Sequence, residues 1–433
     1  MYCKNIAIFS HTIALGGSER VACLLADLLS EEYYNVYLII QKKSDLSYSL
    51  KNNITIYNLE NSKNKYKRTR EILTKYNIDL CIFNDHFIDE TFNFIKLANK
   101  SGIRTIAIEH SSFFFPFYAL DTTNFTKRND GYKYVDRLIV LSPKLEQIWN
   151  ALGIARATFI PNPLTFKKHG QHADKKEKNL IFIGRICYMK GIFEALEIVS
   201  RVAKKFKNVK LYILGRFESN EIENNVKKRV NELCINDNII FIGHTNNIEP
   251  YLSSASVHIM PSMIEGAPMS FYEAKSFGIP TVCFDIPTLF LSTESAGCIM
   301  VGKNDINGMT NAIIRLLDDE QYWETMSKRA MDSLSEIDEK LIASKWNKVI
   351  SDIFTNNNEP STEEYRDNSH IILKEFSSAI DWYNKKDVST LYNDIKYLIP
   401  IHKIITKILP KGSPQRSILK KLFHFLKKLT TLN

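Results

Sequence analysis

Short apolar, β-branched runs alternate with helical stretches along most of the chain, and this alternation constrains the fold more than any other feature. In the first half, the runs typical of strands lie at 5–9, 36–40, 79–83, 103–108, 137–141 and 157–160. The second half repeats the plan at 179–183, 209–214, 238–242, 257–260, 280–284 and 298–301. Strands that alternate with helices at this spacing form parallel sheets with helices on both faces. The sequence therefore predicts two Rossmann-like α/β domains in series.

The join between the two predicted domains lies where two prolines flank a single residue. This segment, Ile160-Pro161-Asn162-Pro163, is followed by a polar stretch rich in Lys, His and Asp. Such a composition is typical of an exposed connection. We therefore expect one domain at residues 1–163 and a second at 164–340. A helix is expected at 341–355, with a basic helical tail at 356–433.

Composition excludes several classes of protein. The chain has 433 residues, 44% hydrophobic and 24% charged, which suits a globular protein of two domains. Its seven cysteines form no C-x-x-C pair, so we expect reduced thiols in a cytoplasmic setting rather than a disulfide framework or a zinc site. A strand begins almost at the first residue, so no secretory signal is expected, and no apolar run reaches the roughly 20 residues of a membrane span.

The net charge of +9 resides entirely in the tail. Residues 396–433 hold nine Lys and Arg and no Asp or Glu, so the other residues sum to zero. A neutral body with a basic tail differs from a uniformly basic nucleic-acid binder, and we expect no nucleic-acid partner. The short basic cluster at 63–70 is weak evidence for such a partner.

The most informative motif is a pair of carboxylates eight residues apart. Glu265 follows the predicted strand 257–260, and Glu273 lies in an apolar, helix-like run that begins near Pro268-Met269-Ser270. Loops at the carboxyl ends of parallel strands are where α/β proteins bind ligands, and helix starts there offer free N–H groups to phosphates. Alone, however, two glutamates at this spacing are commonly just solvated residues that flank a helix.

Two cations stand close to the first strand of the second predicted domain. Gly184 and Arg185 follow the run 179–183, and Lys190 comes five residues later, before Gly191. A strand, a glycine turn and two cations can place both positive charges on a diphosphate, where they would stabilise negative charge that develops in a reaction. The alternative is two exposed cations in an ordinary loop.

The first predicted domain offers two further candidates. Gly16 and Gly17 follow its first strand, and paired glycines let a backbone approach a ligand closely. His110 follows the run 103–108, where a lone histidine is more often structural than catalytic. Directly after it, Phe113-Phe114-Phe115-Pro116-Phe117-Tyr118 either belongs to the core or lines a cleft for an acceptor with a lipid.

Together these motifs resemble the retaining glycosyltransferases of family 4, which have the GT-B fold. The resemblance implies two Rossmann-like parallel-sheet domains facing a central cleft, with a helix, here 341–355, that crosses back to the first domain. It implies that Glu265 touches the transferred sugar, that Glu273 holds the ribose of the nucleotide, and that Arg185 and Lys190 stabilise the departing diphosphate. His110 would orient the sugar. Donor-binding positions would be Gly16, Gly17, Gly184, Arg185, Lys190, Glu265, Pro268, Met269, Ser270 and Glu273.

No Asp-x-Asp, the metal-binding signature of the other major glycosyltransferase fold, occurs in the sequence. We therefore expect no metal and no cofactor, with a nucleotide-sugar, by family frequency a UDP-sugar, as co-substrate. From Arg416 to Leu429, apolar residues fall on one helical face and Lys on the other, which suits an anionic membrane surface. The alternative is a helix docked on the body of the protein.

The sequence thus predicts a retaining glycosyltransferase that acts in bacterial surface-polysaccharide biosynthesis, on a lipid-linked or membrane-anchored glycan acceptor. It would be cytoplasmic and peripheral on the inner face of the cell membrane. A GT-B isomerase of the sugar-nucleotide 2-epimerase type and a non-catalytic partner that binds a sugar nucleotide or glycan remain alternatives. A NAD oxidoreductase is disfavoured because neither domain has a G-x-G-x-x-G fingerprint.

Overall fold

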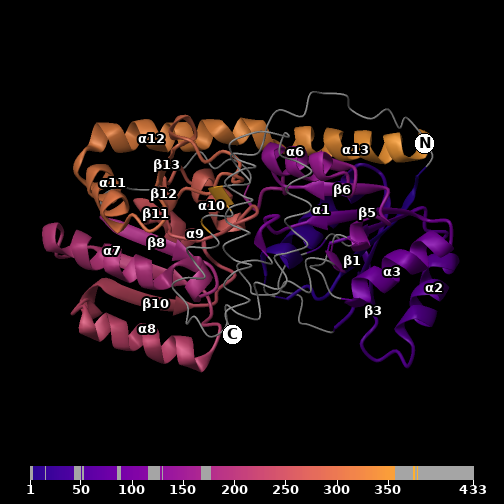
Figure 1. The fold of residues 1–433 in the computed structure, drawn as a ribbon, viewed down its shortest axis with the longest axis horizontal. Helices are drawn as coiled ribbons and strands as arrows, with labels where there is room; N and C mark the ends of the chain where they lie inside the picture. Colours follow the sequence, from indigo (N-terminus) through magenta and orange to yellow (C-terminus); the bar gives the residue numbers. More distant parts are fainter. Residues whose placement is uncertain are drawn as a thin grey trace, which may run out of the picture. The chain divides into compact units, whose positions relative to one another are not determined.

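The computed structural model describes most of the chain and divides it into two units. It describes residues 3–14, 16–42, 50, 53–84, 89–115, 127–128, 130–166, 177–355, 374–375 and 378. Unit 1 comprises Met1–Asn162 and the chain from Ala343 onwards, and unit 2 comprises Pro163–Ile342. In Figure 1 the strands of each unit are flanked by that unit's own helices. The predicted basic tail lies outside the described residues.

Unit 1 is built on a parallel sheet of seven strands in the order β3-β2-β1-β4-β5-β6-β7. The strands are β1 (Asn5–Ser10), β2 (Asn35–Ile40), β3 (Thr55–Asn58), β4 (Leu80–Phe83), β5 (Arg104–Glu109), β6 (Arg137–Val140) and β7 (Ala157–Phe159). Its helices are α1 (Gly17–Glu31), α2 (Lys65–Lys75), α3 (Asp89–Lys100), α6 (Pro143–Leu152) and α13 (Glu339–Thr355). Because the strand order reverses between β1 and β4, the loops after these two strands flank the topological switch point, where α/β sheets bind ligands.

Unit 2 repeats this plan with six parallel strands in the order β10-β9-β8-β11-β12-β13. They are β8 (Asn179–Ile183), β9 (Lys210–Leu214), β10 (Ile239–Gly243), β11 (Val257–Met260), β12 (Thr281–Phe284) and β13 (Cys298–Val301). The helices are α7 (Ile192–Lys205), α8 (Asn220–Glu232), α9 (Glu249–Ser253), α10 (Met269–Ser276), α11 (Ile306–Asp318) and α12 (Glu320–Ser333). Here the switch point lies between β8 and β11.

Both sheets form because their strands are apolar enough to be covered on two faces. All four residues of β4, Leu80-Cys81-Ile82-Phe83, are buried, as are all four of β11. The prediction of two Rossmann-like parallel-sheet domains is thus confirmed. Strand β3 was not predicted. It lies at the sheet edge, and three of its four residues are exposed, so it lacks the apolar run that marks the others.

Helix α13 belongs with unit 1 although it follows unit 2 in the chain. Its apolar face buries Trp346, Val349, Ile350 and Ile353. Asn347 in the same helix accepts a hydrogen bond from the Tyr34 hydroxyl at 2.9 Å and donates to Glu32 at 2.6 Å. These contacts explain why α13 groups with the first sheet.

The aromatic segment after β5 is partly in the core. Phe113 and Phe114 are buried, and the Phe113 ring packs edge-on against Trp149 of α6, with ring centroids 5.2 Å apart. Phe115 is 40% exposed, and residues 116–118 lie outside the described part of the chain. For Phe113 and Phe114, the core interpretation therefore holds. Within the described residues, no helix is long and apolar enough to cross a membrane.

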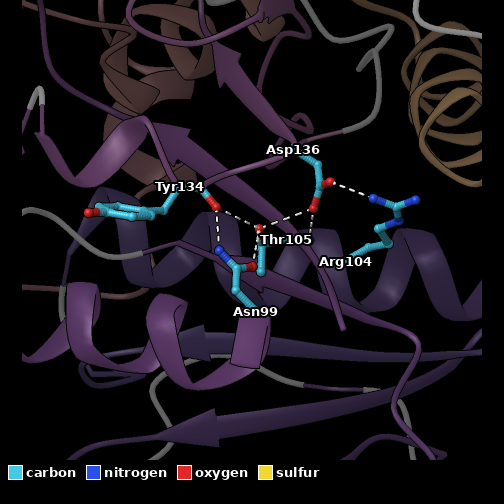
Figure 2. A network of polar contacts seen from close by, with 5 residues as sticks. All are labelled: Asn99, Arg104, Thr105, Tyr134 and Asp136. Carbon is cyan, nitrogen blue, oxygen red and sulfur yellow. Dashed lines mark hydrogen bonds and ion pairs between the residues drawn. The ribbon is translucent and has the colours of Figure 1, made fainter. Parts of the chain in front are cut away.

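A polar network ties the amino-terminal ends of β5 and β6 together (Figure 2). Asp136 accepts hydrogen bonds from the Arg104 guanidinium at 2.9 Å, from the Thr105 backbone N–H at 2.8 Å and from the Thr105 hydroxyl at 3.2 Å. Asn99 of α3 joins by donating to the Tyr134 carbonyl at 2.6 Å. One carboxylate thus holds the starts of two neighbouring strands.

We expect Asp136→Asn to lower the free energy of unfolding of unit 1 by about 1–3 kcal/mol, because an amide loses the charge and turns an N–H group toward a donor. Denaturant unfolding measures this change. Asp130→Asn is the control, since Asp130 forms only an exposed ion pair with Lys133 at 2.6 Å and its loss should cost less than about 0.5 kcal/mol. Equal losses in the two variants would contradict a structural role for the network.

Candidate active site

In unit 2, a lysine that follows β8 and a glutamate that follows β11 form an ion pair at the switch point. Lys190 ends the short 3₁₀ turn η1 (Tyr188–Lys190) after β8, and Glu265 lies on the loop after β11. The Lys190 Nζ lies 2.6 Å from Oε1 and 2.8 Å from Oε2 of Glu265, so both carboxylate oxygens bind one ammonium. The Glu265 side chain is 8% exposed and that of Lys190 30% exposed. This pair is the central contact of the candidate site, and the sequence did not predict it.

The backbone around this pair leaves no room for a side chain. Gly191 adopts φ +73°, and a Cβ atom there would lie 2.0 Å from the carbonyl oxygen of Pro261. The Met263 N–H donates to the Met189 carbonyl at 2.9 Å, which ties the loop after β11 to η1. Glycine at position 191 therefore lets the loops that carry Lys190 and Glu265 approach each other closely.

Arg185 forms an exposed ion pair with Glu218. It follows Gly184 at the end of β8, and its Nη1 lies 3.3 Å from Oε1 of Glu218, with the arginine side chain 68% exposed. Glu218 also lines a cavity of about 410 Å³ at the carboxyl ends of β9 and β10, together with Gly215, Phe217 and Phe241. Arg185 and Lys190 each bind a separate carboxylate, and the sequence did not predict Glu218.

Glu273 is the fifth residue of α10, a helix that begins directly after Pro268. It is 4% exposed, and its Oε1 accepts a hydrogen bond from the Thr165 hydroxyl at 2.8 Å. Met269 and Ser270 form the first turn of α10. The two predicted glutamates therefore lie on different elements and have different partners.

A buried lysine in α10 ties this helix to the elements packed against it. The Lys275 ammonium donates to the Ala296 carbonyl, lies 3.5 Å from the Ser333 hydroxyl, and stands 4.8 Å from the centre of the Phe271 ring. Burial lowers the pKa of Lys275 to about 8. These contacts join α10 to the turn before β13 and to the end of α12.

His258, in the middle of β11, gives the second unit a pH dependence. Burial, and then the positive charge of Lys190, lowers its pKa to about 3, and its Nδ1 lies 3.1 Å from the Thr281 hydroxyl oxygen. The unfolded histidine binds a proton below about pH 6.5, whereas the folded one stays neutral to about pH 3. Protonation therefore favours the unfolded state, and unfolding becomes easier as pH falls through this window.

We expect His258→Asn to flatten the pH dependence of the free energy of unfolding by up to about 1.4 kcal/mol per pH unit between pH 6 and 4, because asparagine does not titrate there. Denaturant unfolding of both proteins at pH 7, 6, 5 and 4 measures the two slopes. The asparagine lowers stability at every pH, so only the slope matters, and parallel curves would contradict the assignment.

In unit 1, the candidate residues lie after β1, β4 and β5. Gly16 precedes α1 with extended backbone, and a Cβ atom there would lie 2.0 Å from the Glu19 carboxylate, which therefore covers this glycine. Gly17 is the first residue of α1. His110 follows β5, and its Nε2 lies 2.8 Å from Oδ1 of Asn84, at the end of β4. The sequence prediction did not include Asn84.

A buried ion pair anchors the chain on both sides of His110. Glu109 accepts hydrogen bonds from the Ser111 N–H at 2.9 Å and the Tyr132 hydroxyl at 3.2 Å, and pairs with Arg128 at 3.4 Å. Burial raises the pKa of Glu109, while Arg128 and these hydrogen bonds act in the opposite direction. Glu109 thus fixes the strand end from which His110 extends.

Comparison with known protein families identifies the chain. A model described as Glycosyltransferase Family 4 matches residues 15–166, and one described as Glycosyl transferases group 1 matches residues 165–332. The chain belongs to the family 4 and group 1 glycosyltransferases. The boundary between the two matched regions falls within three residues of the division between the units. This glycosyltransferase therefore carries Gly16, Gly17 and His110 in its family 4 region and the charged pairs in its group 1 region.

Individual proteins agree with this assignment. The glycosyltransferase is 27% identical over 366 residues to an uncharacterised glycosyltransferase of Haemophilus influenzae, covering 80% of this chain and all of that protein. It is 21% identical over 349 residues to the amylovoran biosynthesis glycosyltransferase AmsD of Erwinia amylovora, covering 78% and 96%. The structure of Anabaena HepE in complex with UDP and glucose superposes with a TM-score of 0.69 at 13% identity, covering 80% and 99%. The predicted GT-B fold is confirmed.

Proposed function

We propose that this glycosyltransferase transfers a sugar from a UDP-sugar to a lipid-linked or membrane-anchored glycan in bacterial surface-polysaccharide biosynthesis, with retention of configuration at the anomeric carbon. The observation that carries the proposal is the Lys190–Glu265 pair at the switch point of unit 2. Arg185 precedes Lys190 in the chain and pairs with Glu218, which lines the cavity. HepE, with the same fold, binds UDP and glucose, and AmsD acts in amylovoran biosynthesis.

The charges fit the breaking of a bond to a diphosphate. As the bond between the anomeric carbon and the diphosphate breaks, the electron pair leaves with the diphosphate. Lys190 and Arg185, which follow β8 in the chain, are the cations proposed to stabilise it. The acceptor hydroxyl then bonds to the same face of the sugar, and its proton passes to the departing phosphate oxygen. In this proposal Glu265 holds Lys190 in place and contacts the sugar, while Glu273 binds the ribose and His110 orients the sugar.

The cavity is the proposed place for the base of the nucleotide. Its volume of about 410 Å³ lies within the range of small-molecule pockets, and Phe217 and Phe241 line it with ring centroids 5.6 Å apart. Aromatic rings provide flat apolar surface for a base.

The proposal includes no metal ion, since Lys190 and Arg185 supply positive charge. Transfer should therefore persist in the presence of a chelator.

A screen of nucleotide-sugars tests the donor. A ligand at 100 times its dissociation constant raises the free energy of unfolding by about 2.7 kcal/mol, so the true donor should raise the melting temperature more than other nucleotide-sugars do. The anomeric configuration of the product, read by NMR, tests retention. An epimer formed from donor alone would instead indicate an isomerase, and no stabilisation by any nucleotide-sugar would contradict the proposal.

The roles of the two glutamates are separable by kinetics. Glu265→Gln should lower kcat more than donor affinity, because its oxygens position the catalytic ammonium, whereas Glu273→Gln should mainly raise KM for the donor. The opposite pattern would mean that the roles are exchanged. Since Gln has the shape of Glu, unfolding curves should show that both variants remain folded.

We also propose that residues 396–433 bind an anionic membrane surface. Nine Lys and Arg without an acidic residue support this proposal, as does the sequence pattern of 416–429, which would place apolar residues on one face of a helix. Deleting residues 396–433 should abolish binding to vesicles that contain anionic lipid while leaving transfer to a soluble acceptor intact. Unchanged vesicle binding would overturn this part of the proposal.

A further inference from the structure

One buried amide connects the two parts of the candidate site in unit 1. Asn84 stands at the end of β4, and its side chain is fully buried. Its Nδ2 donates to the backbone carbonyl of Ser18, in the first turn of α1, at 2.8 Å. Its Oδ1 lies 2.8 Å from Nε2 of His110. Asn84 thus joins the turn that contains Gly17 to the proposed sugar-orienting histidine.

The carbonyl of Ser18 determines which way this amide points. A backbone carbonyl only accepts hydrogen bonds, so the amide of Asn84 must turn its NH₂ group toward Ser18 and its oxygen toward His110. An amide oxygen is likewise only an acceptor, so the Nε2 of His110 must carry a hydrogen. A flipped amide would place two oxygens, Oδ1 of Asn84 and the Ser18 carbonyl, against each other. A neutral His110 is therefore the Nε2–H tautomer.

We infer that Asn84 is a positioning residue: its amide holds the ring of His110 in one orientation and in the Nε2–H tautomer, and couples that ring to the start of α1. Glu109 already fixes the backbone on both sides of His110 through its bond to the Ser111 N–H and its pair with Arg128. An anchored backbone does not by itself fix a ring about its own side-chain bonds, and the bond from His110 to Asn84 restrains that rotation.

The consequence for catalysis rests on the proposed function, in which His110 orients the donor sugar. Because the side chain of Asn84 is fully buried, a donor does not contact it. Asn84→Ala should therefore change the alignment of the sugar through His110 rather than remove a contact with the donor. We expect kcat to fall about 10-fold while KM for the donor changes less than twofold.

NMR of the imidazole nitrogens tests the inference without reference to activity. In protein labelled with ¹⁵N-histidine, the His110 signals are assigned as those missing in His110→Gln, and at high pH they should report the Nε2–H tautomer. Asn84→Ala should give a mixture of tautomers. Asn84→Asp keeps an acceptor oxygen toward His110 but turns a second oxygen toward the Ser18 carbonyl, so it should retain Nε2–H while losing stability. Asn93→Ala is the control, since the exposed Asn93 donates to the hydroxyl of Tyr66, at 3.1 Å, in the same unit.

The two proposals fail in different ways. A wild-type His110 in the Nδ1–H tautomer, or one that Asn84→Ala leaves unchanged, would overturn the inference even if the protein transfers sugar. If the tautomer depends on Asn84 but no nucleotide-sugar is a donor, the inference stands and the proposed function fails. Circular dichroism and unfolding curves show whether Asn84→Ala is folded, and the tautomer of wild-type His110 tests the inference without any substitution.

Discussion

Replacing Lys190 with methionine is expected to lower kcat/KM about 100- to 1,000-fold, the largest effect of any single substitution in the site. The change removes the ammonium that both oxygens of Glu265 bind at 2.6 and 2.8 Å. It also leaves a carboxylate that is 8% exposed without this partner, next to the proposed position of the diphosphate. Two negative groups would then face each other where the structure has an ion pair.

The repulsion between Glu265 and the diphosphate can be separated from the loss of the Lys190 ammonium. In the double variant Lys190→Met with Glu265→Gln, no negative charge remains at position 265, so activity should recover part of the loss if repulsion contributes. Lys205→Met is the matched control, because Lys205 lies at the far end of α7 and forms an exposed pair with Asp318 at 2.7 Å. Steady-state kinetics with the identified donor measures all three. A Lys190→Met enzyme within threefold of wild type would show that Lys190 has no part in transfer.

Gly191→Ala is expected to lower the free energy of unfolding of unit 2 by about 3 kcal/mol or more. A left-handed backbone costs a residue with a Cβ roughly 1–2 kcal/mol, and φ is +73° here. The added methyl would also meet the backbone carbonyl of Pro261 at 2.0 Å, so the loop after β11 must move. Because that loop carries Glu265, activity should fall together with stability.

A second glycine isolates the contribution of the contact. Gly102 has φ +72°, but a Cβ atom there would have no neighbour within 4 Å. Gly102→Ala should therefore cost only the roughly 1–2 kcal/mol of the backbone conformation. Denaturant unfolding of both variants gives the difference, which is the cost of pushing η1 and the loop after β11 apart. If both glycines cost the same, close approach at Gly191 has no structural importance.

The sequence predicted the parts of the fold that depend on local patterns. Twelve apolar runs marked twelve of the thirteen strands that the described residues form, because a strand that is buried on both faces must be apolar along its length. Strand β3 was not predicted because an edge strand does not need an apolar run, and Thr55-Ile56-Tyr57-Asn58 is largely exposed. Local patterns do not predict which strands are neighbours, and therefore do not predict which loops meet at each switch point.

The same limit applies to the candidate site. Glu265 and Glu273 were predicted from their spacing, and Lys190 from its place after a glycine turn, but their partners lie far away in the chain. Lys190 and Glu265 are 75 residues apart, and Thr165 and Glu273 are 108 apart. Asn84 gave no signal because an asparagine after a strand is common in loops. Its importance depends on Ser18 and His110, which only the folded sheet brings to either side of it.

Strand β5 has consequences for protein engineering. Its six residues begin at the Arg104–Thr105–Asp136 network and end at Glu109, next to His110, so roughly 20 Å separates the two ends. Residues that stabilise the sheet and residues proposed to handle the sugar thus occupy opposite margins of one strand. A library that varies the end around Asn99 and Tyr134 should change heat resistance and leave donor preference unchanged. A library around His110 should alter donor preference. The intact network at the other end of β5 should keep such variants folded when the substitutions lower their stability.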